Sequence, residues 1–161
     1  MIPDRFRAVL DELSPLTERF SAAGHRLYLV GGTVRDLLVA DGGDSDDFDA
    51  TTSARPPDIK RCLEGWADAI WTQGERFGTI GAKKGDRIYE ITTHRAEAYV
   101  PDSRKPEVEF SDDVATDLSR RDFTVNAMAL SLPDVERATS AGPGSGAVDA
   151  VVRHWHQQGW L

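Results

Sequence analysis

The segment Asp47-Phe48-Asp49 sets one aromatic residue between two acidic ones. Side chains on a β-strand alternate between its faces, so a strand here directs both carboxylates to one face and Phe48 to the other. The phenyl ring belongs in a hydrophobic core, whereas two adjacent carboxylates repel each other unless a cation lies between them. This segment therefore predicts a sheet with one buried face and one acidic, accessible face.

The composition suits one compact domain and excludes several classes of protein. Hydrophobic residues make up 40% of the 161 residues, which is enough for a core and too many for a disordered chain. No run approaches the ~18 apolar residues of a membrane helix, so we expect no membrane partner. The first residues lack an apolar signal core and Cys62 is the lone cysteine, which predicts a cytoplasmic protein. The net charge of −8 argues against nucleic-acid binding by charge alone, but it permits a nucleic-acid enzyme whose acidic residues hold metal ions.

Hydrophobic periodicity predicts an α/β fold, with a mixed β-sheet and flanking helices. Apolar residues at helical spacing predict a helix over 6–20, which we expect Pro15 to kink or split. We expect Thr33 to be the N-cap of a second helix. The other helices are expected over 33–40, from Pro56 to about Trp66, and over 117–130.

Strands and loops complete the expected order of elements. The expected strands cover 26–30, 47–51, 69–71, 79–82 and 87–93. Residues 98–107 combine two prolines with many charges and predict a mobile loop. Residues 133–146 form a tail rich in Gly, Ser and Ala.

Asp47 and Asp49 are candidate ligands of a divalent cation. Mg²⁺ prefers hard oxygen ligands and often combines one or two carboxylates with substrate phosphates. Glu90 is a third acid, placed between the apolar residues Tyr89 and Ile91 of an expected strand. The alternative is that the five Asp residues between 41 and 49 form one solvated acidic loop. Their spacing fits no EF-hand, and the scattered histidines fit no zinc site.

The stretch from Val30 to Asp36 predicts the end of a strand, a glycine turn and the start of a helix. Gly31 and Gly32 allow backbone N–H groups to approach a phosphate, and the helix dipole favours its negative charge. Arg35 lies in the first helical turn, where a guanidinium can pair with phosphate oxygens. A plain turn is the alternative. The pattern is neither a dinucleotide-binding fingerprint nor a P-loop.

A second polar cluster follows Arg120. If residues 117–130 are helical, Asp122 and Asn126 share one face, with Arg121 beside it. That face suits a sugar hydroxyl together with a phosphate. The alternative is an ordinary amphipathic helix with a charged end.

Taken in order, these segments resemble the catalytic head of bacterial tRNA nucleotidyltransferases (CCA-adding enzymes) and of the related bacterial poly(A) polymerases. Both belong to the DNA polymerase β-type nucleotidyltransferase superfamily. The resemblance covers about residues 20–132 and rests on five motifs, at 29–38, 47–54, 76–81, 89–95 and 120–129. It implies a polymerase β-type head over 1–149, followed by a divergent tail over 150–161.

The resemblance also implies a reaction and its residues. An RNA 3′-hydroxyl would receive CMP or AMP from CTP or ATP, with CCA addition to tRNA favoured over poly(A) addition as the more widespread role. Asp47 and Asp49 would bind Mg²⁺, and Glu90 would take the place of the third superfamily carboxylate. The nucleotide would contact the following residues: Gly31, Gly32, Arg35 and Arg121, with Asp122 and Asn126 close to the ribose.

Two departures from the family open a second hypothesis. The linker between Arg35 and Asp47 is longer than usual in the family. The sequence of residues 151–161 diverges from the family, as expected after a truncation, a frameshift or the splitting of a gene. The neck, body and tail regions of full-length relatives have no counterpart here. The alternative is therefore a non-catalytic nucleotide-binding module that pairs with a helical partner chain or forms a dimer. An exposed apolar patch that includes Trp155 and Trp160 would favour that partner.

Overall fold

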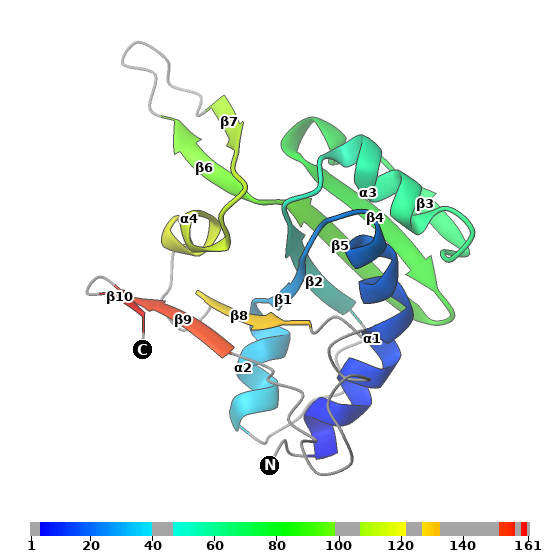
Figure 1. Ribbon diagram of the computed structural model, residues 1–161, viewed down its shortest axis with the longest axis horizontal. Helices are drawn as coiled ribbons and strands as arrows, with labels where there is room; N and C mark the ends of the chain where they lie inside the picture. Colours follow the sequence, from blue (N-terminus) through cyan, green and yellow to red (C-terminus); the bar gives the residue numbers. More distant parts are fainter. Residues whose placement is uncertain are drawn as a thin grey trace.

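The computed structural model describes residues 4–39, 47–98, 107–121, 127–132, 152–156 and 159–160. Figure 1 shows a central β-sheet with helices packed against it. The helical elements are α1 (Asp4–Ala22), α2 (Gly32–Val39), α3 (Pro56–Leu63), the 3₁₀ turn η1 (Glu75–Phe77) and α4 (Val114–Ser119). The strands are β1 (Leu27–Val30), β2 (Asp47–Thr52), β3 (Ala69–Trp71), β4 (Thr79–Lys84), β5 (Arg87–Thr93), β6 (Arg95–Ala98), β7 (Glu107–Phe110), β8 (Met128–Ser131), β9 (Val152–His156) and β10 (Gly159–Trp160).

The main sheet has the strand order β10-β9-β8-β1-β2-β5-β4-β3. Strands β2 and β5 run parallel, whereas the other paired neighbours run antiparallel. The sheet is therefore mixed, and the α/β prediction is confirmed. Strands β6 and β7 form a separate antiparallel pair that projects beyond the end of β5 in Figure 1.

The main hydrophobic core lies between one face of this sheet and helices α1, α2 and α3. Phe48 of β2 and Tyr89 of β5 pack against each other in it in an edge-to-face arrangement, with their ring centroids 5.7 Å apart. Ile59 of α3 and Phe20 of α1 are fully buried against the same face. Helices α1 and α3 contact each other, and Figure 1 shows α3 close to β3 and β4. The aromatic residue between the two aspartates therefore anchors β2 to the core.

The opposite face of the sheet is covered over β1 and β8. There α4 packs through Leu118 on Tyr28 and Val30 of β1 and on Ala129 of β8. This cluster does not include residues of β5. The arrangement leaves Asp47 and Asp49 of β2 on an accessible part of the sheet.

Helix α1 is a single helix, with Pro15 inside it. The expected split at Pro15 is not seen, because the buried face formed by Leu13, Leu16 and Phe20 continues across the proline. A hydrogen bond from the Thr17 hydroxyl to the Leu13 carbonyl, at 2.9 Å, adds to the same turn. Among the described helices, none combines the length and the apolar character needed to cross a membrane.

The expected helix over 117–130 is wrong. Helix α4 ends at Ser119, and β8 begins at Met128 and pairs with β1. Residues 127–130 are buried without interruption, and such a short apolar run does not distinguish a helix from a strand covered on both faces. Helix α3 is also shorter than expected, since it ends at Leu63 rather than near Trp66.

The expected strands of the central sheet are confirmed, with small shifts of their ends. The pairing of β6 with β7 was not expected, because these short strands carry charges and lie outside the main core. The centre of the expected mobile loop, residues 99–106, lies outside the described residues, as does the whole tail over 133–146.

Candidate active site

Asp47 and Asp49 lie on the same accessible face of β2. Both side chains are exposed, whereas Phe48 between them is 2% exposed. The prediction that the two carboxylates share a face is confirmed. Both residues belong to a regular strand rather than to a solvated acidic loop.

A sharp turn brings the paired glycines to Asp49. Strand β1 ends at Val30, and Gly31 then adopts φ of 76°, in the left-handed region that favours glycine. A Cβ atom added at Gly31 would lie 3.7 Å from Oδ2 of Asp49. Helix α2 begins at Gly32. The start of this helix, where backbone N–H groups attract anions, therefore lies beside a carboxylate that can bind metal.

Thr33 is the second residue of α2, so its expected role as the N-cap is wrong. Gly31 already turns the chain, and its carbonyl accepts a hydrogen bond from the Arg35 N–H at 3.3 Å. The Thr33 hydroxyl instead donates to the main-chain oxygen of Asp47 at 3.4 Å. This bond ties the start of α2 to the start of β2.

Arg35 lies over the glycine turn. A Cβ atom at Gly32 would be 3.3 Å from Nη2 of Arg35, so the guanidinium stands at the beginning of the helix. Its Nε donates to Oδ1 of Asp36 at 2.9 Å, and the two side chains are 40% and 39% exposed. An ion pair this exposed contributes only ~0–1 kcal/mol. The ion pair with Asp36 therefore adds little to the stability of the fold.

Glu90 faces the same side as the two aspartates. It is the partner of Asp49 in the parallel pairing of β2 with β5, and its side chain is exposed. In the described parts of the chain, however, no three His, Cys, Asp or Glu side chains come together as a metal site. Asp47 and Asp49, on one accessible face of β2, stay the candidate ligands of a cation.

Asp117 holds a cluster of arginines at the end of α4. Its carboxylate is fully buried and accepts hydrogen bonds from Nη2 of Arg120 at 3.2 Å, from Nη2 of Arg121 at 3.0 Å and from the main-chain N–H of Arg95 at 3.0 Å. Burial raises the pKa of Asp117, but the Arg95 N–H and the charges of Arg121 and Arg120 outweigh this effect, so the pKa lies below its ordinary value. Two guanidinium groups and one main-chain N–H therefore converge on a single buried carboxylate.

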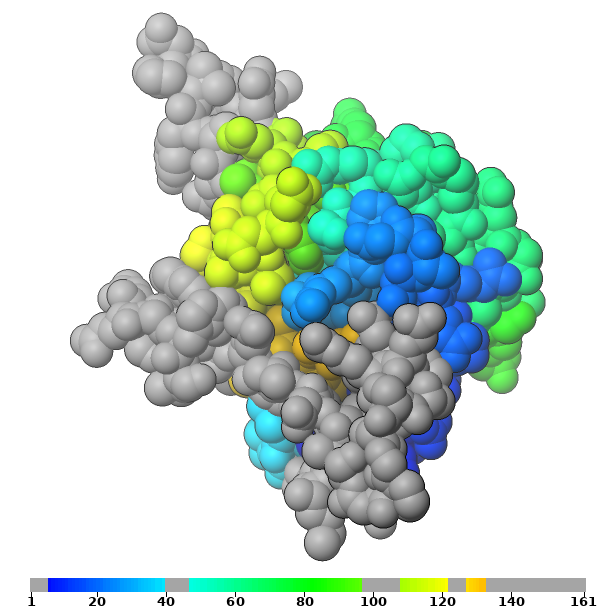
Figure 2. Space-filling view, viewed as in Figure 1, coloured from blue at the N-terminus to red at the C-terminus, as the bar shows by residue number. Residues whose placement is uncertain are grey.

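The arginine cluster reaches the face of the sheet that carries Asp47 and Asp49, because the charge of Arg121 acts on Asp49. Burial raises the pKa of Asp49, the positive charge of Arg121 lowers it, and the neighbouring Asp47 raises it, with a net shift upward. Burial is the largest of these effects, and the charge of Arg121 offsets only part of it. The two carboxylates on this accessible face of β2 suit a divalent cation, which prefers such oxygen ligands. Figure 2 shows the yellow segment over 114–121 next to the orange residues 127–132 and the cyan helix α2 beyond them.

The structure brings together the predicted site residues that it describes. Gly31, Gly32, Arg35, Asp47 and Asp49 meet at the turn between β1 and α2, and Arg121 is coupled to Asp49. Asp122 and Asn126 lie outside the described residues.

Sequence reasoning missed Asp117. Its spacing from Arg120 and Arg121, three and four residues, was the available signal, because residues so spaced are neighbours on a helix.

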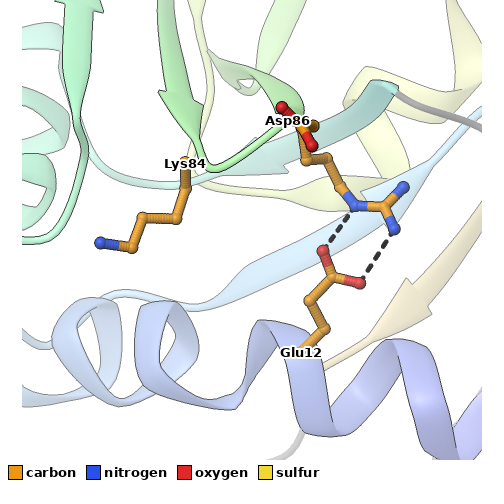
Figure 3. A pocket seen from close by; sticks show the side chains of 4 residues that line it. Glu12, Lys84 and Asp86 are labelled. Carbon is orange, nitrogen blue, oxygen red and sulfur yellow. Dashed lines mark hydrogen bonds and ion pairs between the residues drawn. The ribbon is translucent and has the colours of Figure 1, made fainter.

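The cavity in Figure 3 lies away from this site. It is lined by Glu12 of α1 and by Lys84, Asp86 and Arg87 at the turn between β4 and β5. Glu12 pairs with the Arg87 guanidinium through two hydrogen bonds, of which the one to Oε2 measures 3.0 Å. Arg87 also stacks over the ring of Phe48, on the core side of the sheet. This cavity therefore opens on the face opposite to Asp47 and Asp49.

Comparisons with known proteins agree with this geometry. Residues 27–148 match the family described as the poly A polymerase head domain. A CCA-adding enzyme from Lactobacillus helveticus (strain DPC 4571) is 42% identical over 130 residues, which are 80% of this chain and 31% of that enzyme. The chain thus spans about a third of the length of the curated relatives it matches.

Solved structures show the same fold. The crystal structure of the Bacillus stearothermophilus CCA-adding enzyme in complex with CTP matches with a TM-score of 0.60 and 32% identity, over 81% of this chain and 28% of that one. A tRNA nucleotidyltransferase complexed with a primer tRNA and an incoming ATP analog matches with a TM-score of 0.62 and 26% identity, over 88% of this chain and 34% of that one.

Proposed function

The chain belongs to the family of poly A polymerase head domains, and we propose on this basis that it is the catalytic head of an RNA nucleotidyltransferase. Its substrates are CTP or ATP and the 3′-hydroxyl of an RNA, and CCA addition to tRNA is the favoured reaction. Poly(A)-type addition is the alternative reaction. The CCA-adding relatives at about 40% identity favour the first. We place the reaction in the cytoplasm, as the lone cysteine predicts.

The observation that carries this proposal is the position of the two aspartates beside the glycine turn. Asp47 and Asp49 share an accessible face, and Asp49 lies against Gly31 at the start of α2. The superfamily generally uses a divalent metal, and we propose Mg²⁺ held by these two carboxylates. Bound there, Mg²⁺ supplies positive charge that makes the RNA hydroxyl more acidic and offsets the charge of the leaving group.

The remaining residues bind and orient the nucleotide. The N–H groups at Gly31 and Gly32 and the Arg35 guanidinium hold the triphosphate at the start of α2. Arg121 adds a second positive contact near Asp49. We propose Asp122 and Asn126 as contacts of the ribose, and Glu90 as an acid next to the RNA 3′ end.

The proposed reaction is a single displacement at the α-phosphorus. The RNA 3′-oxygen forms a bond to that phosphorus while the bond to the oxygen that bridges to the β-phosphate breaks. Pyrophosphate leaves with the electron pair, and the hydroxyl proton passes to solvent. No covalent bond to the protein is needed, so positioning and electrostatics account for the catalysis.

Nucleotide incorporation tests the proposal. The purified chain is mixed with Mg²⁺, each nucleoside triphosphate in turn and tRNA lacking its 3′ terminus. We expect incorporation, and a loss of ~10³-fold or more in Asp47→Ala and in Asp49→Ala. Asp86→Ala, which removes an exposed acid on the opposite side of the sheet, is the matched control and should retain the wild-type rate.

The pattern of incorporation separates the readings. CTP addition followed by ATP addition supports the CCA reaction, and repeated ATP addition supports poly(A)-type activity. Triphosphate binding without turnover would contradict the catalytic proposal and favour the nucleotide-binding module with a helical partner. Normal rates in either aspartate variant would contradict the site itself.

A further inference from the structure

One row of residues crosses four strands on the face of the sheet that carries Asp47 and Asp49. Asp49 of β2 is paired with Glu90 of β5, Glu90 with Gly81 of β4, and Gly81 with Trp71 of β3. Residues paired across neighbouring strands point to the same face of a sheet. Strands are spaced by ~4.8 Å, so the row extends about 14 Å from Asp49 to Trp71.

Gly81 makes room in this row for the indole of Trp71. A Cβ atom added at Gly81 would lie 1.9 Å from Nε1 and 2.2 Å from Cε2 of Trp71. The ring therefore lies directly on the backbone of β4 and extends from the edge strand towards Glu90. Trp71 is only partly buried, so the indole keeps part of its surface in solvent.

The geometry of an in-line displacement indicates whether the triphosphate or the RNA lies over this row. The glycine turn and Arg35 sit on the β1 side of Asp49, and the proposed function places the triphosphate there. In an in-line displacement the attacking and the leaving oxygens lie on opposite sides of the phosphorus. The RNA 3′-hydroxyl must then approach from the β5 side, where the row continues through Glu90 to Trp71.

We propose that Trp71 is a stacking platform for a base near the 3′ end of the RNA that is extended. The inference rests on the proposed function, because that function supplies the RNA. Stacking on an aromatic ring tolerates every base, which suits a strand whose last nucleotide changes with each addition.

A neighbouring cation fits the same ligand. Lys83 is paired with Ile88 of β5 and with Ala69 of β3, so its side chain points to the face of Gly81 and Glu90. It is exposed. Single-stranded nucleic acid is commonly bound by aromatic rings next to basic side chains, which contact the bases and the phosphates. Trp71 and Lys83 form such a pair.

The test measures RNA binding without catalysis. A fluorescein-labelled RNA hairpin with a single-stranded 3′ end is titrated with the full chain in Mg²⁺ and without nucleotide, and its anisotropy is followed. We expect Trp71→Ala to weaken binding about tenfold or more and Trp71→Phe, which keeps an aromatic ring, to remain within about threefold.

Ile70→Ala is the matched control. Ile70 lies on the same strand and is 36% exposed, but its partner Ala82 belongs to the main core, so Ile70 points to the other face. Its replacement should leave RNA affinity unchanged. Equal affinities of wild type and Trp71→Ala, equal losses in Trp71→Ala and Ile70→Ala, or no RNA binding by the wild type would each overturn the inference.

Failure here is distinguishable from failure of the proposed function. RNA binding that depends on Trp71, in a chain that incorporates no nucleotide, supports the platform and contradicts the catalytic proposal. Incorporation with unchanged RNA affinity in Trp71→Ala contradicts the platform and leaves the catalytic proposal standing.

Discussion

Asp117 is a buried carboxylate whose role is to hold two arginines. The Nε–H groups of Arg95, Arg120 and Arg121 are buried without a hydrogen-bond partner within the described ranges, which is costly for stability. Burial, followed by the charge of Arg120, lowers the pKa of Arg95. Because the cluster holds three arginines and one carboxylate, we expect it to attract an anion. Asp117 therefore positions Arg121 next to Asp49.

Replacing Asp117 with Asn tests that role. The amide keeps the size of the side chain and one acceptor for the Arg95 N–H, but it removes the charge that Arg120 and Arg121 face. We expect the free energy of unfolding to fall by about 3 kcal/mol in urea denaturation at pH 7, because one partner of a buried ion pair is lost. We also expect the KM for the nucleotide to rise more than kcat falls.

Asp58→Asn is the control for Asp117→Asn. Asp58 pairs with Arg61 on the surface of α3, so its loss should cost less than about 1 kcal/mol. An unchanged nucleotide KM in Asp117→Asn would show that the carboxylate serves the fold alone.

Among single residues, the sequence predicted those whose position in the site is set by their neighbours in the chain. Asp47 and Asp49 share a face because strands alternate, and Gly31 lies beside them because it follows a strand. The role of Asp117 depends on the main chain of Arg95, which is distant in sequence. The role of Trp71 depends on the register that sets it against Gly81.

The turn between β1 and α2 is the element on which the site depends. Gly31 and Gly24 both have positive φ, 76° and 81°, so an alanine at either position is strained by about 1–2 kcal/mol. The surroundings of the two residues differ. A Cβ atom at Gly24 meets nothing within 4 Å, whereas one at Gly31 contacts Oδ2 of Asp49.

This difference predicts the behaviour of two matched variants. Gly24→Ala and Gly31→Ala should lose similar stability in thermal denaturation. Nucleotide affinity, measured by isothermal titration with CTP and Mg²⁺, should fall about tenfold or more in Gly31→Ala alone, because its methyl group occupies space between the turn and the carboxylate. Equal affinity in the two variants would place the triphosphate elsewhere.

Helices and strands were predicted well where apolar and polar residues alternate with a regular period. They were predicted poorly where burial on both faces removes that alternation. The alternation in β2 and the glycine that ends β1 identified these elements. The run from Ala127 to Leu130 is buried on both faces, so it carries no period, and a helix was expected where β8 pairs with β1. Strands β6 and β7 gave no signal, because they pair with each other rather than with the core.

At the scale of the whole molecule, His94 joins the main sheet to the pair β6 and β7. The main-chain N–H of His94 donates to the Thr52 carbonyl at 2.8 Å, and its main-chain carbonyl accepts from the Ser111 N–H at 2.7 Å. The ring is 1% exposed, and its Nδ1 is hydrogen-bonded to the Thr51 hydroxyl at 2.7 Å. A charge on this ring would be buried at the junction of the two sheets.

Burial lowers the pKa of His94 from 6.5 to about 4, although Asp117, Asp113 and Asp112 raise it, and Arg55 lowers it further. Above pH 6.5 the ring is neutral in both the folded and the unfolded chain. Between pH 6.5 and pH 4 the unfolded chain binds a proton that the folded chain does not. The free energy of unfolding therefore falls as the pH decreases through this range, by about 3 kcal/mol in total at 1.36 kcal/mol for each pKa unit.

Urea denaturation at pH 7.0, 5.5 and 4.5 measures this loss, and His94→Gln is the variant for comparison. Glutamine keeps a polar side chain without a proton to gain, so its stability should be lower at pH 7 but flatter between pH 6.5 and 4. The low pKa of Asp117 acts in a different window, since the stability it contributes is lost only as the pH falls below the ordinary value of 3.8. A wild-type curve as flat as that of His94→Gln would mean that His94 gains its proton in the folded chain as readily as in the unfolded chain, and it would contradict the lowered pKa.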